Sequence, residues 1–220
     1  MDPMVTPVPP SLDAWDRRVI SVEHHIRGVN NQTLMLTTDA GPMVLRLYRT
    51  NDLERIDHEH RLLIALHRLP LPFGTPEPLS TSTGTTSPRV PWQGSSVVAA
   101  LFPLLPGSRP ADGSLVQAEA CGRAIGQLHV AMARLPAAVV QRTACPRIDS
   151  IDPIVRSPVA AAAAIGDDRA TGARLAQAVE RVMINDDAFQ RGRMDVIHGD
   201  PFGGNFLVAG DEVSAVLDFE

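Results

Sequence analysis

The sequence predicts an α+β fold in which a β-rich first half is followed by a mostly helical second half. Three observations lead to this prediction. Short Thr-, Leu- and Val-rich segments separated by Gly, Asn, Asp and Pro recur through residues 19–104, as expected for strands and turns. Longer segments with helical spacing follow from Ser114 onward. Two short apolar segments around Gly210 then indicate a late β-hairpin.

An antiparallel meander of three strands is predicted at the start of the β-rich half. Turns rich in Gly, Asn, Asp and Pro separate the strands, because Gly and Asn tolerate positive φ. We expect the strands at residues 19–27, 32–38 and 43–49. A short helix over residues 11–18, capped by its serine, precedes them, and the proline-containing residues 1–10 are expected to form a loose arm.

One helix and two further strands complete this half. Residues 51–69 carry apolar side chains at a spacing near 3.6, which predicts a helix ending at the prolines that follow. Strands are predicted at residues 77–82 and 95–104. Pro106-Gly107 then breaks the chain, so we place a domain boundary there, with residues 1–105 in one lobe and 106–220 in the other.

The second half is predicted to contain three helices. They cover residues 114–135, 152–165 and 170–184, the first capped by its serine and the second containing a helix-prone Ala run. Short strands return at residues 195–197 and within 206–219, where Gly-Asp forms the turn of a hairpin.

Composition narrows the classes of function. The net charge is −5 and 4% of residues are aromatic, so the basic stripe and stacking platforms of nucleic-acid-binding proteins are not expected. The longest apolar run, residues 97–105, is too short to cross a membrane, and the N-terminus lacks signal-peptide features. Cys121 and Cys145 lack zinc-ligand spacing and are expected to be free thiols. These features predict a cytoplasmic protein that binds neither nucleic acid nor membrane.

The chemistry is concentrated in residues 198–220. A His-Gly-Asp sequence at residues 198–200 is followed five positions after its aspartate by Asn205, and a Leu-Asp-Phe-Glu sequence comes next. Phosphoryl transfer needs a carboxylate that orients the acceptor hydroxyl and accepts its proton, and an amide oxygen with a second carboxylate that hold Mg²⁺. Asp200, Asn205 and Asp218 fit these roles in that order. The Asp-to-Asn spacing is also that of the kinase catalytic loop.

A simpler interpretation of these residues is an ordinary turn. His and Asp beside Gly are common turn residues, so His-Gly-Asp alone is a weak signal. The combination with Asn205 and Asp218 favours the catalytic interpretation. We expect His198 to brace the loop by hydrogen bonding rather than to transfer protons.

On these residues the sequence resembles the aminoglycoside phosphotransferase and choline kinase-like superfamily, which has a bilobal protein-kinase-like fold. The HGDxxxxN and (I/L)D(F/W)(E/D) motifs of that family match residues 198–205 and 217–220. The resemblance implies a β-rich N-lobe with one helix, a mostly helical C-lobe, and ATP and Mg²⁺ as cofactors. It also implies Asp200 as the catalytic base, with Asn205 and Asp218 as the metal ligands.

Two segments of the first half resemble nucleotide-binding parts of that family. The turn containing Gly28, Asn30 and Asn31 resembles the nucleotide-covering loop, although it lacks GxGxxG and an ordinary β-turn fits almost as well. The strand of residues 43–49 resembles the one that bears the phosphate-binding lysine, and Arg46 stands at that position. Arg grips phosphate bidentately but is not equivalent to Lys. The alternative is a surface arginine on a strand.

Glu59 lies on the apolar face of its predicted helix, where a carboxylate needs a partner. The resemblance to the kinase Lys–Glu pair implies that this partner is Arg46. The alternative is a half-exposed glutamate at the edge of the apolar face.

Residues 97–105 resemble the strand and hinge between the two lobes. The adenine edge would then meet backbone groups near Pro103 and Leu105, and Phe102 would line the pocket. The alternative, a buried strand, is compatible with this role. Further along, Gly-Gln-Leu-His ending at His129 resembles a family motif, and we expect that histidine to be a hydrogen-bonded core residue.

Family members continue beyond the Leu-Asp-Phe-Glu motif with helices that complete the C-lobe. The resemblance therefore implies that the chain is truncated and its C-lobe incomplete. We expect exposed apolar surface, with marginal stability or self-association as the result.

The function that fits best is an ATP- and Mg-dependent phosphotransferase. It would move the γ-phosphate to a hydroxyl of a small molecule of aminoglycoside, amino alcohol or amino acid type. A protein Ser/Thr kinase of the same fold stays open. A nucleotide-binding pseudokinase or inactive fragment is favoured by Arg46 and by the expected truncation, and disfavoured by the intact Asp200, Asn205 and Asp218. A metal-dependent hydrolase would need more clustered His and Asp ligands.

Overall fold

The computed structural model of the protein describes five stretches of the chain, residues 10–27, 31–140, 157–165, 169–190 and 196–219. The chain forms two compact units, one of residues 1–140 with 197–220 and one of residues 141–196. The lobe boundary predicted after residue 105 lies within the first unit and stays a prediction. The predicted N-terminal arm falls almost entirely outside the described residues.

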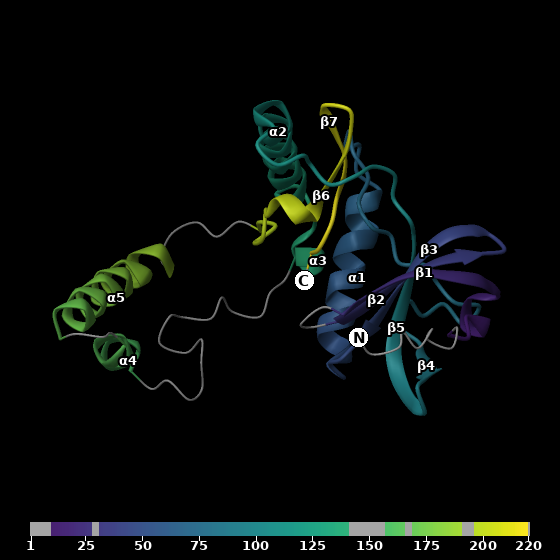
Figure 1. Ribbon diagram of the computed structural model, residues 1–220, viewed down its shortest axis with the longest axis horizontal. Helices are drawn as coiled ribbons and strands as arrows, with labels where there is room; N and C mark the ends of the chain where they lie inside the picture. The colour runs from purple at the N-terminus through teal and green to yellow at the C-terminus, as the bar shows by residue number, and fades with distance from the viewer. Residues whose placement is uncertain (1–9, 28–30, 141–156, 166–168, 191–195, 220) are drawn as a thin grey trace, which may run out of the picture. The chain divides into compact units, whose positions relative to one another are not determined.

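A five-stranded antiparallel sheet is the main β structure of the first unit (Figure 1). Its spatial order is β1-β2-β3-β5-β4. The strands are β1 (Val19–Arg27), β2 (Asn31–Thr38), β3 (Gly41–Tyr48), β4 (Arg89–Trp92) and β5 (Ser95–Pro103). The predicted three-stranded meander is confirmed. The short helix predicted before it is reduced to a single 3₁₀ turn, η1 (Asp13–Trp15), which packs into the core.

Alternation along β3 separates the core from the face that carries polar side chains. Leu45 and Leu47 are buried in the main apolar cluster with residues of β2, β5 and η1. Because successive strand residues point to opposite faces, Arg46 and Tyr48 lie on the other face, where they meet α1 (Leu53–His67).

Helix α1 begins directly after its N-cap residue, Asp52. The Asp52 carboxylate accepts a hydrogen bond from the Arg55 backbone N–H at 3.1 Å, which satisfies one of the free amides of the first turn. The helix ends at His67, just before the prolines that were predicted to limit it. Its buried face carries both apolar and polar side chains, namely Ile56, Glu59, His60, Leu62, Leu63 and Leu66.

The strand predicted at residues 77–82 is wrong. Pro78 lacks a backbone N–H donor, so this segment forms no continuous ladder. Its Leu79 N–H bonds to Leu101 O at 2.8 Å, whereas its Thr81 N–H bonds locally to Thr85 O at 2.8 Å. The sheet edge is formed instead by β4, which pairs with β5. The proline inside β4, Pro91, is exposed on this edge, which is where a sheet tolerates proline.

The remainder of the first unit is α2 (Leu115–Met132), the short α3 (Ala137–Val140), a 3₁₀ turn η2 (Gly203–Asn205) and the hairpin of β6 (Phe206–Ala209) and β7 (Glu212–Val216). Ser114 caps α2 by accepting the Gln117 N–H, as predicted. The hairpin with its Gly-Asp turn is also confirmed. No strand forms at residues 196–197; residue 195 lies outside the described residues.

Two distant segments hold the hairpin along both of its edges. On the β7 side, Gly74 N–H donates to Ser214 O at 2.8 Å and Gly74 O accepts from Val216 N–H at 3.0 Å. On the β6 side, Ser108 and Val208 exchange two backbone hydrogen bonds of 3.0 and 2.8 Å. The loop that enters β6 and the loop that leaves β7 are therefore fixed to the rest of the unit.

The approach of the chain to the hairpin requires glycine at position 107. Gly107 has φ +122°, and a Cβ there would lie 2.3 Å from Ser214 Oγ and 2.9 Å from Val208 O. Gly107→Ala is therefore expected to reduce the free energy of unfolding by about 2–4 kcal/mol through backbone strain and overpacking. Equilibrium denaturation would measure this loss.

Gly113→Ala is the matched control for this substitution. Gly113 also has positive φ, +77°, but a Cβ would meet no atom within 4 Å, so only the backbone strain of about 1 kcal/mol is expected. Equal losses for the two variants would contradict the packing argument.

The second unit contains α4 (Pro158–Ala164) and α5 (Arg169–Gln190). Ser157 caps α4 by accepting the Ala160 N–H at 3.2 Å, and Gly172 lets α5 approach the backbone of Ala163. The predicted helices at residues 152–165 and 170–184 correspond to these two, although residues 152–156 lie outside the described residues.

Candidate active site

Asp200 and Asn205 lie side by side in the loop that leads into β6. The Asn205 Nδ2 group donates to Asp200 Oδ2 at 2.9 Å and to the Asp200 backbone O at 3.0 Å. The η2 turn fixes this geometry, because Asn205 N–H bonds to Phe202 O at 2.8 Å. With its amide nitrogen directed to Asp200, Asn205 keeps its amide oxygen as the atom suited to a cation.

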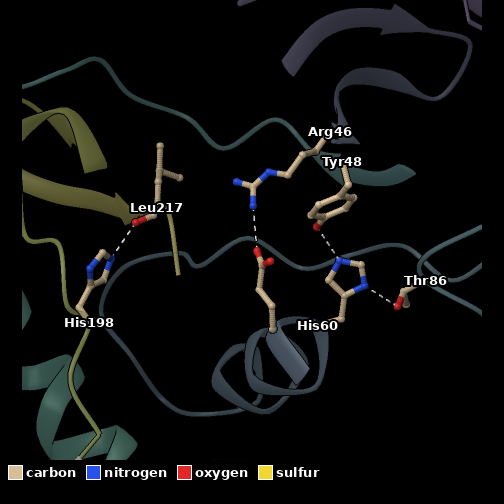
Figure 2. A network of polar contacts seen from close by, with 7 residues as sticks. Arg46, Tyr48, His60, Thr86, His198 and Leu217 are labelled. Atoms are coloured by element: carbon tan, nitrogen blue, oxygen red, sulfur yellow. Dashed lines mark hydrogen bonds and ion pairs between the residues drawn. The ribbon is translucent and has the colours of Figure 1, made fainter. Parts of the chain in front are cut away.

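His198 joins this loop to the residue before Asp218. Its Nε2 lies 2.8 Å from Leu217 O, a contact that Figure 2 shows, and its Nδ1 lies 3.3 Å from the Asp200 backbone N–H. Since the carbonyl accepts and the amide donates, the hydrogen-bond network assigns the Nε2–H tautomer. The buried ring also stacks at a tilt on Phe219, with centroids 4.8 Å apart. The predicted bracing role of His198 matches these contacts.

His129 of α2 supports the same loop from a distant part of the sequence. Its Nε2 accepts a hydrogen bond from the His198 backbone N–H at 3.1 Å. This contact, which no local pattern in the sequence revealed, ties the loop to a helix that the core already holds.

Asp218 follows β7 with an unusual backbone conformation. Its φ is 62°, in the left-handed region that non-glycine residues rarely adopt, and its side chain is half-buried. The preceding Leu217 is held from both sides: its N–H donates to Asn205 O at 2.8 Å and its O accepts from His198. Backbone contacts thus link the segments that carry all three predicted catalytic and metal-binding residues.

Arg46 and Glu59 form the ion pair that the sequence suggested. Arg46 Nη1 lies 2.8 Å from Glu59 Oε1, and the side chains are 18% and 8% exposed. The Arg46 Cζ atom also lies 5.7 Å from the centroid of the Phe102 ring. Arg46 is therefore not a surface residue and Glu59 is not half-exposed. Their role toward a nucleotide stays a prediction.

His60, beside Glu59 on α1, belongs to a buried polar chain that the sequence motifs did not reveal. Its Nε2 lies 2.9 Å from the Tyr48 hydroxyl and its Nδ1 lies 2.7 Å from the Thr86 hydroxyl (Figure 2). The side chain is only 1% exposed. A signal was present, because His60 lies four positions after Ile56 and three before Leu63, within the apolar stripe of the helix.

Burial lowers the pKa of His60 from 6.5 to about 4, with a smaller raising effect from Asp57 and a smaller lowering effect from Arg46. The folded pKa is below the unfolded one, so the unfolded chain binds more protons between these values. The free energy of unfolding should therefore keep the full contribution of neutral His60 above pH 6.5. It should fall by up to about 3 kcal/mol as the pH approaches 4. Denaturation midpoints measured across this range would show the loss.

His60→Gln supplies the reference for that pH dependence. Glutamine does not titrate, so the additional loss between pH 6.5 and 4 should disappear in this variant. A slope equal to that of the unmodified chain would assign the effect to other groups.

The remaining residues predicted to bind nucleotide are only partly described. Gly28 and Asn30 lie outside the described residues, whereas Asn31 begins β2 opposite Tyr48. Phe102 is buried on β5, Pro103 ends that strand, and Leu105 is half-buried in the loop that follows.

A hollow of about 690 Å³ lies beside the loop that carries Asp200 and Asn205. It is lined by residues of that loop, of α2 and of the segment that precedes α2, among them Phe202, Gly204, Ala118, Cys121, Ile125 and Arg109. Burial raises the pKa of the Cys121 thiol. In the stretches that the structure describes, no three His, Cys, Asp or Glu side chains gather as a metal site, and no helix is long and apolar enough to span a bilayer.

These features define a kinase-like phosphotransferase fold. The profile of the Phosphotransferase enzyme family (APH) matches residues 22–220, and the chain belongs to that family. The resemblance to this family and its kinase-like fold is thereby confirmed.

Known relatives include two bacterial homoserine kinases. That of Rhodopseudomonas palustris is 26% identical over 203 residues, covering 91% of this chain and 58% of the relative. That of Methylobacterium nodulans is 29% identical over 209 residues, covering 91% and 59%. The chain thus spans less than two thirds of the curated relatives that it matches.

Solved structures agree on the fold. A microcompartment-associated aminopropanol kinase aligns with a TM-score of 0.70 at 21% identity, covering 94% of this chain and 66% of the other. An amicoumacin kinase in complex with AMP-PNP, Ca²⁺ and Ami aligns with a TM-score of 0.60 at 14% identity, covering 97% of this chain and 60% of the other.

Proposed function

We propose that this chain carries the phosphoryl-transfer site of an ATP- and Mg²⁺-dependent kinase whose acceptor is a hydroxyl of a small molecule. The observation that carries the proposal is the contact between Asp200 and Asn205 in a loop that His198 ties to the segment of Asp218. Family membership and the small-molecule kinases among its relatives support the same class of reaction.

Asp200 is exposed and stands where an acceptor hydroxyl could reach it. In the proposed reaction the acceptor oxygen forms a bond to the γ-phosphorus, and the bond between that phosphorus and the β–γ bridging oxygen breaks. The hydroxyl proton passes to Asp200, and ADP leaves. The hydrogen bond from Asn205 orients the Asp200 carboxylate for this role.

The donor set fits a hard divalent cation. The Asn205 amide oxygen and the Asp218 carboxylate are oxygen ligands of the kind that Mg²⁺ prefers. When bound, Mg²⁺ would neutralise charge on the phosphates. Arg46, oriented by Glu59, would contact the phosphates, while Phe102 and the backbone near Pro103 and Leu105 would hold the adenine ring.

The acceptor is proposed to be an amino alcohol, an amino acid or an aminoglycoside. The similar proteins are named as kinases of homoserine and aminopropanol, and one was solved in complex with kanamycin. Each of these three small molecules carries a hydroxyl and an amine. A second candidate is a nucleotide-binding protein that does not transfer phosphate. The replacement of the phosphate-binding lysine by Arg46 favours it.

Thermal unfolding with and without nucleotide tests the proposal. Mg·ATP at 100 times its dissociation constant should stabilise the folded chain by about 2.7 kcal/mol. The shift should need both Mg²⁺ and ATP, and should be lost in Asp218→Asn but kept in Asp211→Asn, an exposed carboxylate on the same hairpin. Phosphate transfer to a panel of amino alcohols then separates the two candidates. A folded chain that shows no shift would count against both.

A further inference from the structure

We propose that His60 is a positioning residue that holds Glu59 in place to orient Arg46. The proposal rests on the proposed function for its effect on nucleotide binding. It rests on the structure alone for its effect on the ion pair.

The two neighbours on α1 contact two neighbours on one face of β3. Glu59 bonds to Arg46, and His60 bonds to Tyr48 two residues further along the strand. Strand residues two apart share a face, so both contacts join the same surface of the sheet to the same turn of the helix. The rotation of α1 that sets the reach of Glu59 is therefore the rotation that His60 fixes.

The third contact extends the arrangement to another segment. Thr86 lies in the loop before β4, and its hydroxyl is 2.7 Å from His60 Nδ1. The imidazole thus spans the strand and the loop, with a hydroxyl at each ring nitrogen. Its ring also meets the Phe102 ring edge-on, with centroids 6.1 Å apart. The Arg46 guanidinium lies over the same Phe102 ring.

An apolar residue would fill this space without fixing the helix in one orientation. A neutral imidazole, with one donor and one acceptor, satisfies both hydroxyls only in a narrow set of orientations. A hydrogen-bonded buried network of this kind specifies a unique arrangement where apolar packing tolerates several. An ion pair that places a phosphate-binding group requires such a unique arrangement.

The direct test is the NMR signal of the Arg46 Nε–Hε group in the 220-residue chain, assigned by its absence in Arg46→Lys. Tyr48→Phe and Thr86→Val each remove one hydroxyl, and His60→Leu removes both contacts. We expect the Arg46 signal to move toward that of exposed arginines, most in His60→Leu. His60→Asn, which keeps a polar group near the Nδ1 position, and His60→Gln, which keeps one near the Nε2 position, should restore it partly.

Trp15→Phe controls for general destabilisation. It removes the 3.0 Å hydrogen bond from the indole to Leu79 O, on the core face of the sheet and away from α1. The Arg46 signal should not change in this variant. An unchanged signal in folded Tyr48→Phe, Thr86→Val and His60→Leu would overturn the proposal, and the two hydroxyl variants decide the outcome if His60→Leu fails to fold.

Nucleotide affinity supplies the second arm. His60→Leu should weaken Mg·ATP binding by about tenfold in the unmodified background and by less than about twofold in Arg46→Ala, because His60 acts on the nucleotide only through Arg46 and residues of one network couple. Equal losses in both backgrounds would contradict action through Arg46. If the unmodified chain binds no nucleotide, the proposed function fails, while the NMR result still decides whether His60 positions the ion pair.

Discussion

Asp200→Asn should lower the rate of phosphate transfer by about 100- to 10,000-fold while leaving the affinity for Mg·ATP nearly unchanged. The amide cannot accept the proton of the acceptor hydroxyl, but it retains an oxygen that can take the 2.9 Å hydrogen bond from Asn205. The loop should therefore keep its shape. Single-turnover kinetics with an amino alcohol acceptor, combined with thermal shifts, would separate the rate from the affinity.

Asp211→Asn is the control for this loss. Asp211 is an exposed aspartate at the β6–β7 turn, so its substitution changes the net charge equally without touching the loop. Its transfer rate should equal that of the unmodified chain. A wild-type rate in Asp200→Asn would remove this residue from the role of base.

Glu59→Gln should lower the free energy of unfolding by about 3 kcal/mol. The substitution removes the carboxylate charge that faces Arg46 across 2.8 Å, in a place where both side chains are largely shielded from water. A guanidinium does not lose its proton, so the charge of Arg46 cannot adjust. Equilibrium denaturation at neutral pH measures the difference.

Glu119→Gln provides an exposed pair for comparison. Glu119 meets Arg123 at 3.2 Å along α2, but its side chain is 77% exposed, so a loss of about 0.3–0.5 kcal/mol is expected. If the two variants lost the same stability, burial would not be what strengthens the Arg46–Glu59 pair.

Local patterns in the sequence were enough to predict much of the fold. The strands of the meander, α1, the Ser114 cap and the hairpin follow from alternation, helical spacing and turn residues within a few positions of one another. Asp200 and Asn205 could be paired for the same reason, since five positions in a tight loop bring them into contact.

What the sequence could not predict depends on contacts between distant residues. The wrong strand at residues 77–82 is a local exception, because Pro78 lacks a backbone donor and the sheet edge is formed by β4, which pairs with β5 across a two-residue turn. His60 meets Thr86 and His129 meets His198 only once the chain has folded. The left-handed backbone of Asp218 likewise depends on the tethering of Leu217, which no local pattern encodes.

The double attachment of the β6–β7 hairpin also has a consequence for biosynthesis. Ser214 and Pro106, which are joined by a hydrogen bond, are 108 positions apart, so at about 5–20 residues per second the ribosome needs roughly 5–20 s to make the second after the first. During that interval Gly74 and Ser108 present backbone donors and acceptors whose strand partners have not yet been synthesised. Nascent chains that extend past Ser108 but have not reached Ser214 should therefore depend on chaperones more than chains that contain the hairpin, because unpaired strand edges promote aggregation.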